Sequence, residues 1–246
     1  MAGAVPLRAV LFDAGATLVH PDPPVEAIYS RELAADGALF TEEGLSRALT
    51  RAWEDVHATP ASDRYGGVRG EAEFWKKFLA RVRSVLDGGI LSAAAFDRIA
   101  SHFRSPAAWA IYDDVVPTLG ELSRRGLKMA VVSNWDSHLP TLLAALELDR
   151  FFPVVAVSSI EEVGKPDPEI FHRACRRLEV DPAESLHVGD SVSEDFEGAR
   201  SAGLAALLLD RRDAFPGIAD RIVSLGEIPK RLDEASSTPF AILPSS

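Results

Sequence analysis

Four short polar segments, each placed directly after an apolar run, contain residues whose types could do chemistry together. Their central members are Asp13, Ser133, Lys165 and Asp190. Two carboxylates that lie close together repel each other, and one of them takes up a proton unless a cation relieves the conflict. Mg²⁺ does so readily, because it prefers oxygen ligands and keeps several waters beside one or two carboxylates. The set therefore predicts a Mg²⁺ site that includes both aspartates.

The same side chains suit a phosphoryl group. Lys165 supplies a movable positive charge and Ser133 a hydroxyl donor, so together they could neutralise an anion that carries several oxygens. A carboxylate such as Asp13 can attack phosphorus and form an aspartyl-phosphate, which divides one difficult hydrolysis into two easier steps. The predicted chemistry is transfer of a phosphoryl group to Asp13 and then to water.

Apolar, β-prone runs must position these segments; they cover residues 7–12, 128–132, 154–157, 185–188 and 204–209. Runs that are apolar nearly throughout suit strands covered on both faces, as in a parallel sheet. Helical patterns lie between them, and in one of these Asp167 can cap the helix while Pro168 occupies its first position. The alternation predicts an α/β fold with a Rossmann-like parallel sheet, where ligands bind beyond the carboxyl ends of the strands.

The stretch 21–106 has a different pattern, with several amphipathic helices and no convincing strand. Apolar stripes at helical spacing cover residues 25–33, 74–86 and 96–103, with Gly37 and Gly88-Gly89 as stop signals and Ser92 as a cap. One crossover helix is enough between two parallel strands, so the excess predicts an inserted all-helical cap domain over 21–106. Residues 1–20 and 107–246 would then form the catalytic core.

Composition restricts the partners of this chain of 246 residues. Lys and Arg number 26 against 37 Asp and Glu, a formal net charge of −11. Such a chain repels the phosphates of nucleic acid and anionic membrane surfaces, so we expect neither as a partner. No apolar run approaches the roughly 20 residues that span a bilayer. A single cysteine, Cys175, and the lack of a signal-peptide pattern predict a cytoplasmic protein, while the oligomeric state stays open.

The order of the four segments resembles the haloacid dehalogenase (HAD) superfamily, in the subgroup with a helical cap inserted after the first motif. The likeness extends from Leu7 to about Leu209, and the segments 165–171 and 189–195 are its most specific parts. The resemblance implies that Asp13 is the nucleophile and that Ser133, Asn134 and Lys165 hold the phosphoryl oxygens of a small phosphorylated metabolite. It also implies Mg²⁺ ligands, namely Asp13, the backbone carbonyl of Gly15, Asp190 and, directly or through water, Asp195.

One departure from the family pattern concerns the proton donor. Phosphatases of this family usually read Asp-x-Asp-Gly-Thr, and the second Asp is the general acid for the leaving group, but this chain has Gly15 there. General acid catalysis contributes about 10²–10⁴-fold, so we expect a phosphatase that is slow or needs a good leaving group. Two alternatives remain open: a 2-haloacid dehalogenase-type hydrolase, and a catalytically impaired phosphate-binding or interaction protein. The retained Gly189-Asp190 pair favours a metal over a halide site.

Several other residues could bear on the missing acid or on the substrate. His20, Asp22, Asp136 and His138 follow motif strands and are candidates to replace the acid, although solvated loop positions are the simpler interpretation. Lys76 and Lys77 are expected to be solvated on their helix. Trp135 could line the crevice, whereas Trp53, Trp75 and Trp109 are expected to pack within the cap and hinge.

Overall fold

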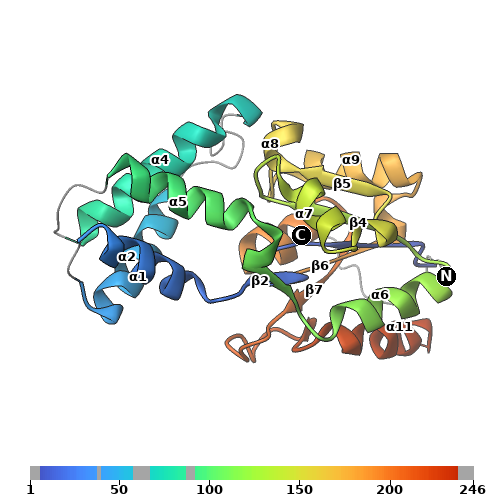
Figure 1. Cartoon of the computed structure of the whole chain (residues 1–246). Helices are drawn as coiled ribbons and strands as arrows, with labels where there is room; N and C mark the ends of the chain where they lie inside the picture. The colour runs from blue at the N-terminus through green and yellow to red at the C-terminus, as the bar shows by residue number, and fades with distance from the viewer. Residues whose placement is uncertain (1–5, 38–39, 58–66, 87–91, 238–246) are drawn as a thin grey trace.

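A computed structural model describes residues 6–37, 40–57, 67–86 and 92–237 (Figure 1). Its main sheet has six strands in the order β5-β4-β1-β6-β7-β8, and every neighbouring pair is parallel. The strands are β1 (Ala9–Phe12), β4 (Lys128–Ser133), β5 (Val154–Val157), β6 (Ser185–Gly189), β7 (Ala205–Leu209) and β8 (Arg221–Ile222). The predicted α/β fold is confirmed. Strand β8 was not predicted, since two residues are too few to show a pattern.

The central strand β1 places the first polar segment beside two others. All four of its residues are buried, and Phe12 pairs with Val131 of β4 on one side and with Val188 of β6 on the other. Because the strands are parallel and in this register, the chain leaves β1, β4 and β6 at the same edge of the sheet. Asp13, Ser133 and Asp190 therefore all lie at that edge.

Alternate residues of β1 contribute to two hydrophobic cores, one on each face of the sheet. Val10 and Phe12 face a core that includes α6 (Val115–Arg124), α7 (Leu139–Ala145) and α11 (Ile228–Ser237). Ala9 and Leu11 face a second core with α9 (Pro168–Leu178) and α10 (Gly198–Ser201). Burial on both faces explains why the strands read as continuous apolar runs.

Helix α9 forms where the sequence predicts it. The Asp167 side chain accepts a hydrogen bond from the Glu169 amide at 2.9 Å, and Pro168 occupies the first helical position. Ile170, Phe171, Ala174, Cys175 and Leu178 are buried on one face, so the cysteine is a core residue. The helix fixes the end of the loop that carries Lys165.

Within the described residues, four helices form a separate block beside the sheet, on the left in Figure 1. They are α1 (Val25–Ala35), α2 (Glu42–His57), α4 (Gly67–Val85) and α5 (Ala93–Arg104), with a hydrophobic core of their own. Gly37 follows α1 with a φ of 78°, and the Ser92 side chain accepts from the Ala95 amide at 3.1 Å, so both end signals act as expected. Gly88, Gly89 and the side chain of Phe96 lie outside the described residues.

Two short strands join this block to the sheet. Strand β2 (Val19–Pro21) pairs antiparallel with β3 (Trp109–Ile111), so the chain enters and leaves the helical block side by side. They were not predicted, because three residues are too few to show alternation. The division of the chain at 20/21 and 106/107 stays a prediction.

The remaining helices are short. Helix α8 covers Ser158–Glu161, a π-helical turn (η4) covers Val192–Glu197, and 3₁₀ helices cover Pro106–Ala108, Asp149–Phe151, Pro182–Glu184 and Leu225–Glu227. Within the described ranges, no helix has both the length and the apolar character needed to cross a bilayer.

Candidate active site

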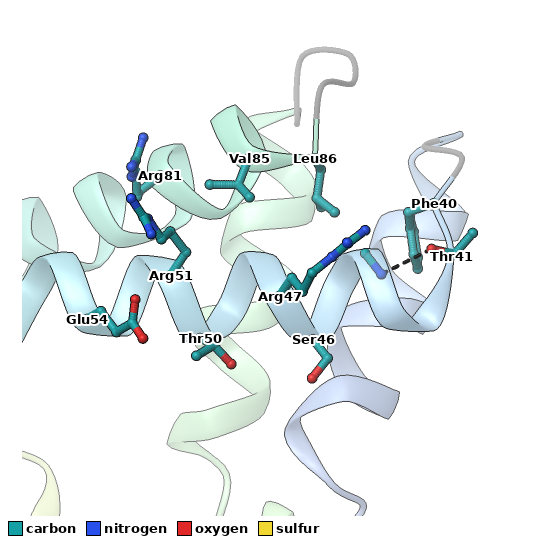
Figure 2. Close-up of a pocket in the computed structure, with 11 residues that line it drawn as sticks. Phe40, Thr41, Ser46, Arg47, Thr50, Arg51, Glu54, Arg81, Val85 and Leu86 are labelled. Atoms are coloured by element: carbon teal, nitrogen blue, oxygen red, sulfur yellow. Dashed lines mark hydrogen bonds between the residues drawn. The ribbon is translucent and has the colours of Figure 1, made fainter.

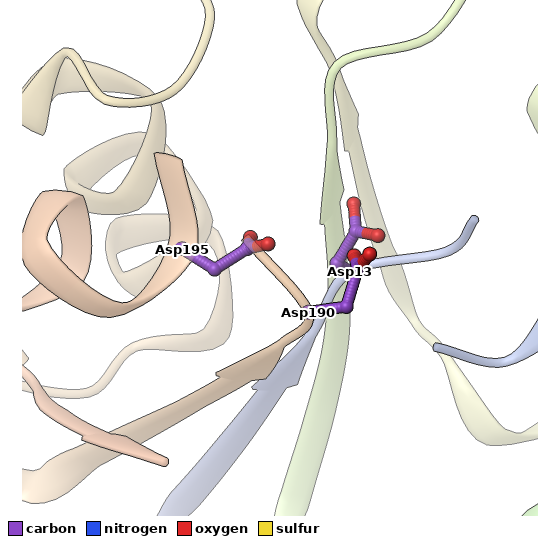
Figure 3. A group of neighbouring side chains, drawn as sticks. All are labelled: Asp13, Asp190 and Asp195. Atoms are coloured by element: carbon purple, nitrogen blue, oxygen red, sulfur yellow. The ribbon is translucent and has the colours of Figure 1, made fainter. Parts of the chain in front are cut away.

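Three aspartates meet at the carboxyl ends of the central strands. Asp13 follows β1, Asp190 follows β6, and Asp195 lies in the turn η4 (Figure 3). One carboxylate oxygen of each lies within 4.8 Å of those of the other two. Asp13 and Asp195 are buried, whereas Asp190 is exposed at the opening. The structure thus brings together three carboxylates from segments that are up to 182 residues apart in the chain, from 13 to 195.

Lys165 places a positive charge between two of these carboxylates. Its Nζ donates to Asp13 Oδ1 at 2.7 Å and to Asp195 Oδ1 at 2.5 Å, and the side chain is 2% exposed. Burial by itself lowers the pKa of an ammonium group, but the charges of Asp13 and Asp195 outweigh it and raise the pKa of Lys165 above its ordinary value. The lysine therefore stays charged and anchors the buried part of the cluster.

Asp13 receives its two side-chain hydrogen bonds on one oxygen. Ser133 Oγ donates to Oδ1 at 2.8 Å, and Lys165 donates to the same atom. Burial raises the pKa of Asp13 above its ordinary value, against the lowering effect of Lys165. Among the described residues no side chain or backbone amide donates to Oδ2, so this oxygen is available for a substrate or a cation.

Asn134 contacts the protein backbone. Its Oδ1 accepts from the Lys165 amide at 2.8 Å, and its Nδ2 donates to the Lys165 carbonyl at 2.9 Å and to Glu194 Oε2 at 2.9 Å. These bonds hold the main chain of Lys165 on both sides. The sequence predicted Asn134 as a residue that contacts the substrate; the structure shows it bound to the loop that carries the lysine.

Asp195 is bonded through both of its oxygens. Besides Lys165, His187 Nε2 lies 2.8 Å from Oδ1, and the Ser191 amide donates to Oδ2 at 3.0 Å. Burial raises the pKa of this carboxyl, but Lys165 and His187 more than offset that effect and hold it below the usual range. Asp195 is therefore ionised, and its bonds orient Lys165.

His187 is a functional-site neighbour that the sequence reasoning missed. It lies in β6, is fully buried, and burial lowers its pKa below the ordinary value. The neutral ring can donate from Nε2 to Asp195, while Nδ1 is buried without a partner among the described residues. The available signal was a histidine inside an apolar strand run, since such a ring needs a polar partner.

Two glycines are required by close approaches around this site. A Cβ on Gly189 would lie 2.2 Å from Asp195 Cγ, and a Cβ on Gly198 would lie 3.0 Å from Pro166 Cα. The first glycine lets the Asp195 carboxylate rest against the end of β6. The second lets the chain after η4 pack on the loop that contains Lys165. These close approaches explain why the segment that carries Asp190 and Asp195 is flanked by the two glycines.

The carboxylate cluster carries more negative than positive charge. Although Asp190 reaches solvent, the protein around it removes part of its hydration, and this loss together with the charges of Asp13 and Asp195 raises its pKa to about 7. Three carboxylates face one ammonium group, and the atoms that these carboxylates offer to a metal ion are all oxygens. This donor set fits a hard divalent cation such as Mg²⁺.

None of the four candidates for the missing acid has a hydrogen bond to the carboxylate cluster among the described residues. The carboxylate of Asp136 accepts from the Trp75 indole at 3.3 Å and from the His138 amide at 3.0 Å. His138 Nε2 lies 2.8 Å from the Arg104 carbonyl, and His20 Nδ1 lies 3.1 Å from the Pro21 carbonyl. Asp22, Lys76 and Lys77 are exposed.

A hollow of about 700 Å³ lies elsewhere, between α2 and α4, with Arg47, Arg51 and Arg81 on its walls (Figure 2). It lies at the C-terminal end of α4, where Val85 is the last helical residue and Leu86 follows it. The other end of α4 approaches the core, where a Cβ on Gly67 would lie 3.1 Å from Glu162. A helix of this length spans about 28 Å, so the hollow is separate from the carboxylate cluster.

Comparison with known proteins places the chain among hydrolases. The family profile described as haloacid dehalogenase-like hydrolase matches residues 7–203. The mouse haloacid dehalogenase-like hydrolase domain-containing protein 3 is 32% identical over 215 residues, which cover 85% of this chain and 84% of the mouse protein. The phosphoserine phosphatase of Thermus thermophilus is 30% identical over 214 residues, which cover 83% of this chain and 82% of that enzyme.

Solved structures agree with this similarity. A HAD phosphatase from Thermococcus onnurineus superposes with a TM-score of 0.64 and 26% identity, covering 92% of this chain and 98% of the other. A crystal structure of a dehalogenase superposes with a TM-score of 0.67 and 26% identity, covering 92% and 96%. Both activities therefore occur among proteins that are similar to this chain.

Proposed function

The chain belongs to the haloacid dehalogenase-like hydrolase family, and we propose that it hydrolyses a small phosphorylated metabolite through an aspartyl-phosphate on Asp13. The observation that carries this proposal is the pattern of hydrogen bonds at Asp13. Lys165 and Ser133 hold Oδ1, while Oδ2 has no donor among the described residues. A carboxylate held in this way presents one oxygen to an incoming phosphorus atom.

In the proposed first step, Oδ2 of Asp13 attacks phosphorus. The bond between phosphorus and the leaving oxygen breaks, and its electron pair stays on that oxygen. Ser133 and Lys165 stabilise the phosphoryl oxygens, because a hydroxyl donor and an ammonium group act where negative charge gathers. Asn134 and Asp195 act as positioning residues, since they hold the main chain and the side chain of Lys165. In the second step water attacks phosphorus, which releases phosphate and regenerates the Asp13 carboxylate.

Mg²⁺ is the cofactor that this donor set favours. We assign its ligands to Asp13, Asp190 and the carbonyl of Gly15, with Asp195 in contact through water because both of its oxygens are already bonded. When bound, Mg²⁺ would neutralise the phosphoryl group and the carboxylates around it. The similarity to a phosphoserine phosphatase supports a small phosphate monoester as the substrate class.

The proposal is tested with a panel of phosphorylated metabolites, each assayed with and without added Mg²⁺. We expect turnover that depends on Mg²⁺ and an acid-labile phosphoryl adduct on Asp13, detected by mass spectrometry after rapid quenching. Asp13→Asn should abolish both. Asp190→Asn should raise the Mg²⁺ concentration that is needed for half-maximal turnover. Full turnover by Asp13→Asn would refute the proposal.

A 2-haloacid dehalogenase is the second candidate, favoured by the dehalogenase structure of 26% identity and by the absence of an acidic residue at position 15. In that reaction Asp13 would form an ester with carbon and release halide. Chloride release from a 2-haloacid without added metal would establish it. A protein that binds Mg²⁺ and phosphate but turns over neither class would instead be a binding protein.

A further inference from the structure

The side chain of Trp135 fills the space next to Gly15. A Cβ built on Gly15 would lie 3.1 Å from Cζ3 of the indole, closer than most real Cβ contacts. The backbone does not require glycine here, since a φ in the left-handed region occurs at the next residue, Ala16, and not at Gly15. The contact with the indole is therefore the feature that a side chain at position 15 would have to displace.

Hydrogen bonds fix the main chain of Trp135, and the Trp109 ring packs on its indole. The Trp135 amide donates to Ser158 Oγ at 3.1 Å, and its carbonyl accepts from the Ser159 amide at 3.3 Å. Its ring packs on the ring of Trp109, with centroids 5.0 Å apart, and belongs to the edge of the main hydrophobic core. A Cβ at position 15 would meet the carbon edge of this ring, so the ring would have to give by a few tenths of an ångström, and its carbon atoms offer a new carboxylate no hydrogen bond.

Trp135 also lies where the end of the sheet meets the helical block. In-line displacement puts the leaving oxygen opposite the attacking Oδ2, and a leaving group that points away from the end of β1 would face this junction. Trp109, which supports the indole, begins the connecting strand β3, and the next residue after Trp135 bonds Trp75 of α4. An aromatic ring thus occupies this junction next to position 15.

We propose that Gly15 and Trp135 act as a pair that restricts the enzyme to phosphoryl compounds whose leaving oxygen is weakly basic, with aryl phosphates preferred. This inference rests on the proposed function. The leaving oxygen departs as an oxyanion and takes its proton from solvent, so a weakly basic leaving group reacts fastest. In the second step, one proton of the attacking water stays on the phosphate and the other passes to solvent. A planar leaving group also packs on the indole.

The test is a series of aryl and alkyl phosphates of graded leaving-group pKa, assayed for kcat/KM. For the wild type, kcat/KM should be about 100-fold or more lower for alkyl phosphates than for nitrophenyl phosphates, because general acid catalysis is missing. Gly15→Asp alone should not narrow this range, because the indole obstructs the new carboxylate. Gly15→Asp combined with Trp135→Ala should reduce the difference in kcat/KM between aryl and alkyl phosphates by about tenfold or more.

Matched controls separate the pair from general effects. Trp53→Ala removes an exposed cap tryptophan and should leave the leaving-group dependence unchanged. As a readout without turnover, 4-nitrobenzylphosphonate should bind about tenfold more tightly than methylphosphonate, in the range of one aromatic contact. Trp135→Ala should lose this difference and Trp53→Ala should keep it. Thermal unfolding identifies any variant that fails to fold, and Trp135→Phe, a smaller change, then replaces Trp135→Ala in both assays.

Two results overturn the inference while leaving the phosphatase assignment intact. One is a flat dependence on leaving-group pKa in the wild type, and the other is a Gly15→Asp variant that narrows the range as much as the double variant. If no phosphate in the series shows turnover that depends on Asp13, the proposed function fails and this inference fails with it.

Discussion

At the scale of single residues, Lys165 has the most concentrated set of charged contacts in the site. Its ammonium group is buried between the carboxylates of Asp13 and Asp195, each of which it bonds directly. Asp195 is in turn held by His187 and by the Ser191 amide. The lysine therefore orients Asp13, and its positive charge opposes the protonation of two buried carboxylates that lie next to each other.

Lys165→Met removes this charge and keeps the length of the side chain. Removing one partner of a buried ion pair costs about 3–5 kcal/mol, and turnover should fall by about 100-fold or more. Without the lysine, burial and mutual repulsion raise the folded-state pKa values of Asp13 and Asp195 above the unfolded value of about 3.9. Stability is then lost as pH rises through the folded pKa. The free energy of unfolding of Lys165→Met should therefore lie further below that of the wild type at pH 8 than at pH 5.

Urea unfolding at the two pH values measures this difference. Lys128→Met is the matched control, because Lys128 is exposed at the start of β4 and its Nζ bonds only the Leu178 carbonyl among the described residues. The control should change the unfolding free energy little and equally at both values. An equal deficit at pH 5 and pH 8 in Lys165→Met would contradict the expected charge conflict.

At the scale of elements, helix α4 contacts the loop between β4 and α7, which follows Ser133. Glu71 accepts from the Ser137 amide at 2.6 Å and from its hydroxyl at 2.9 Å, and Trp75 donates to Asp136. Burial and the charge of Glu71 raise the pKa of Asp136. These contacts join the helical block to the loop that also carries Trp135, and we predict that they favour closure of the block over a bound substrate.

Glu71→Ala removes two hydrogen bonds at this junction. Bonds to a charged group contribute about 1.5–3 kcal/mol, so kcat/KM should fall roughly tenfold, mainly through KM, as closure becomes less favourable. Glu73→Ala, an exposed glutamate on the same helix, should leave kcat/KM unchanged. Amide exchange at Ser137 provides a direct readout, since only the first variant should accelerate it. Unchanged exchange and KM in Glu71→Ala would show that the contact does not control closure.

At the scale of the whole molecule, Arg211 connects parts of the chain that are far apart in sequence. Its guanidinium bonds both oxygens of Asp114 at 2.9 Å, donates to the carbonyls of Ala16 and Thr17, and lies 3.9 Å over the Tyr112 ring. The C-terminal part of the sheet thus holds the loop that follows Asp13. Ser224 and Leu225 also donate to Asp114, which ties a third segment to this point.

Asp114→Asn should lower the unfolding free energy by about 2 kcal/mol at pH 7. Desolvation raises the pKa of Asp114, but the bonds from Arg211, Ser224 and Leu225 lower it below its usual value overall. A folded pKa below the unfolded value gives stability that is present above about pH 4 and is lost as pH falls through the folded pKa. The difference from wild type should therefore shrink below about pH 4.

Denaturant unfolding across pH 3 to 8 tests this expectation, with the neighbouring exposed residue in Asp113→Asn as the control. That control should follow the wild type at every pH. A deficit in Asp114→Asn that persists undiminished at pH 3 would show that packing, and not the ionised carboxylate, provides the stability.

Local sequence patterns were sufficient for five of the six strands of the sheet, for α9 and for the order of the polar segments. Strands buried on both faces must be apolar throughout, and the Asp167-Pro168 start of α9 acts through neighbouring residues only. Because parallel strands expose their carboxyl ends at one edge, the sequence also predicted which residues would gather there. The short strands β2 and β3 escaped prediction, since they exist only because the two chain segments pair with each other.

Only the tertiary structure decided which partner each of those residues contacts. Asn134 bonds the backbone of a residue 31 positions later, His187 bonds Asp195 from inside the sheet, and the Trp135 ring fills the space beside Gly15. Each depends on an interatomic distance between segments that no local pattern encodes. The sequence shows a glycine at position 15, and only the packed structure shows that the Trp135 ring lies against it.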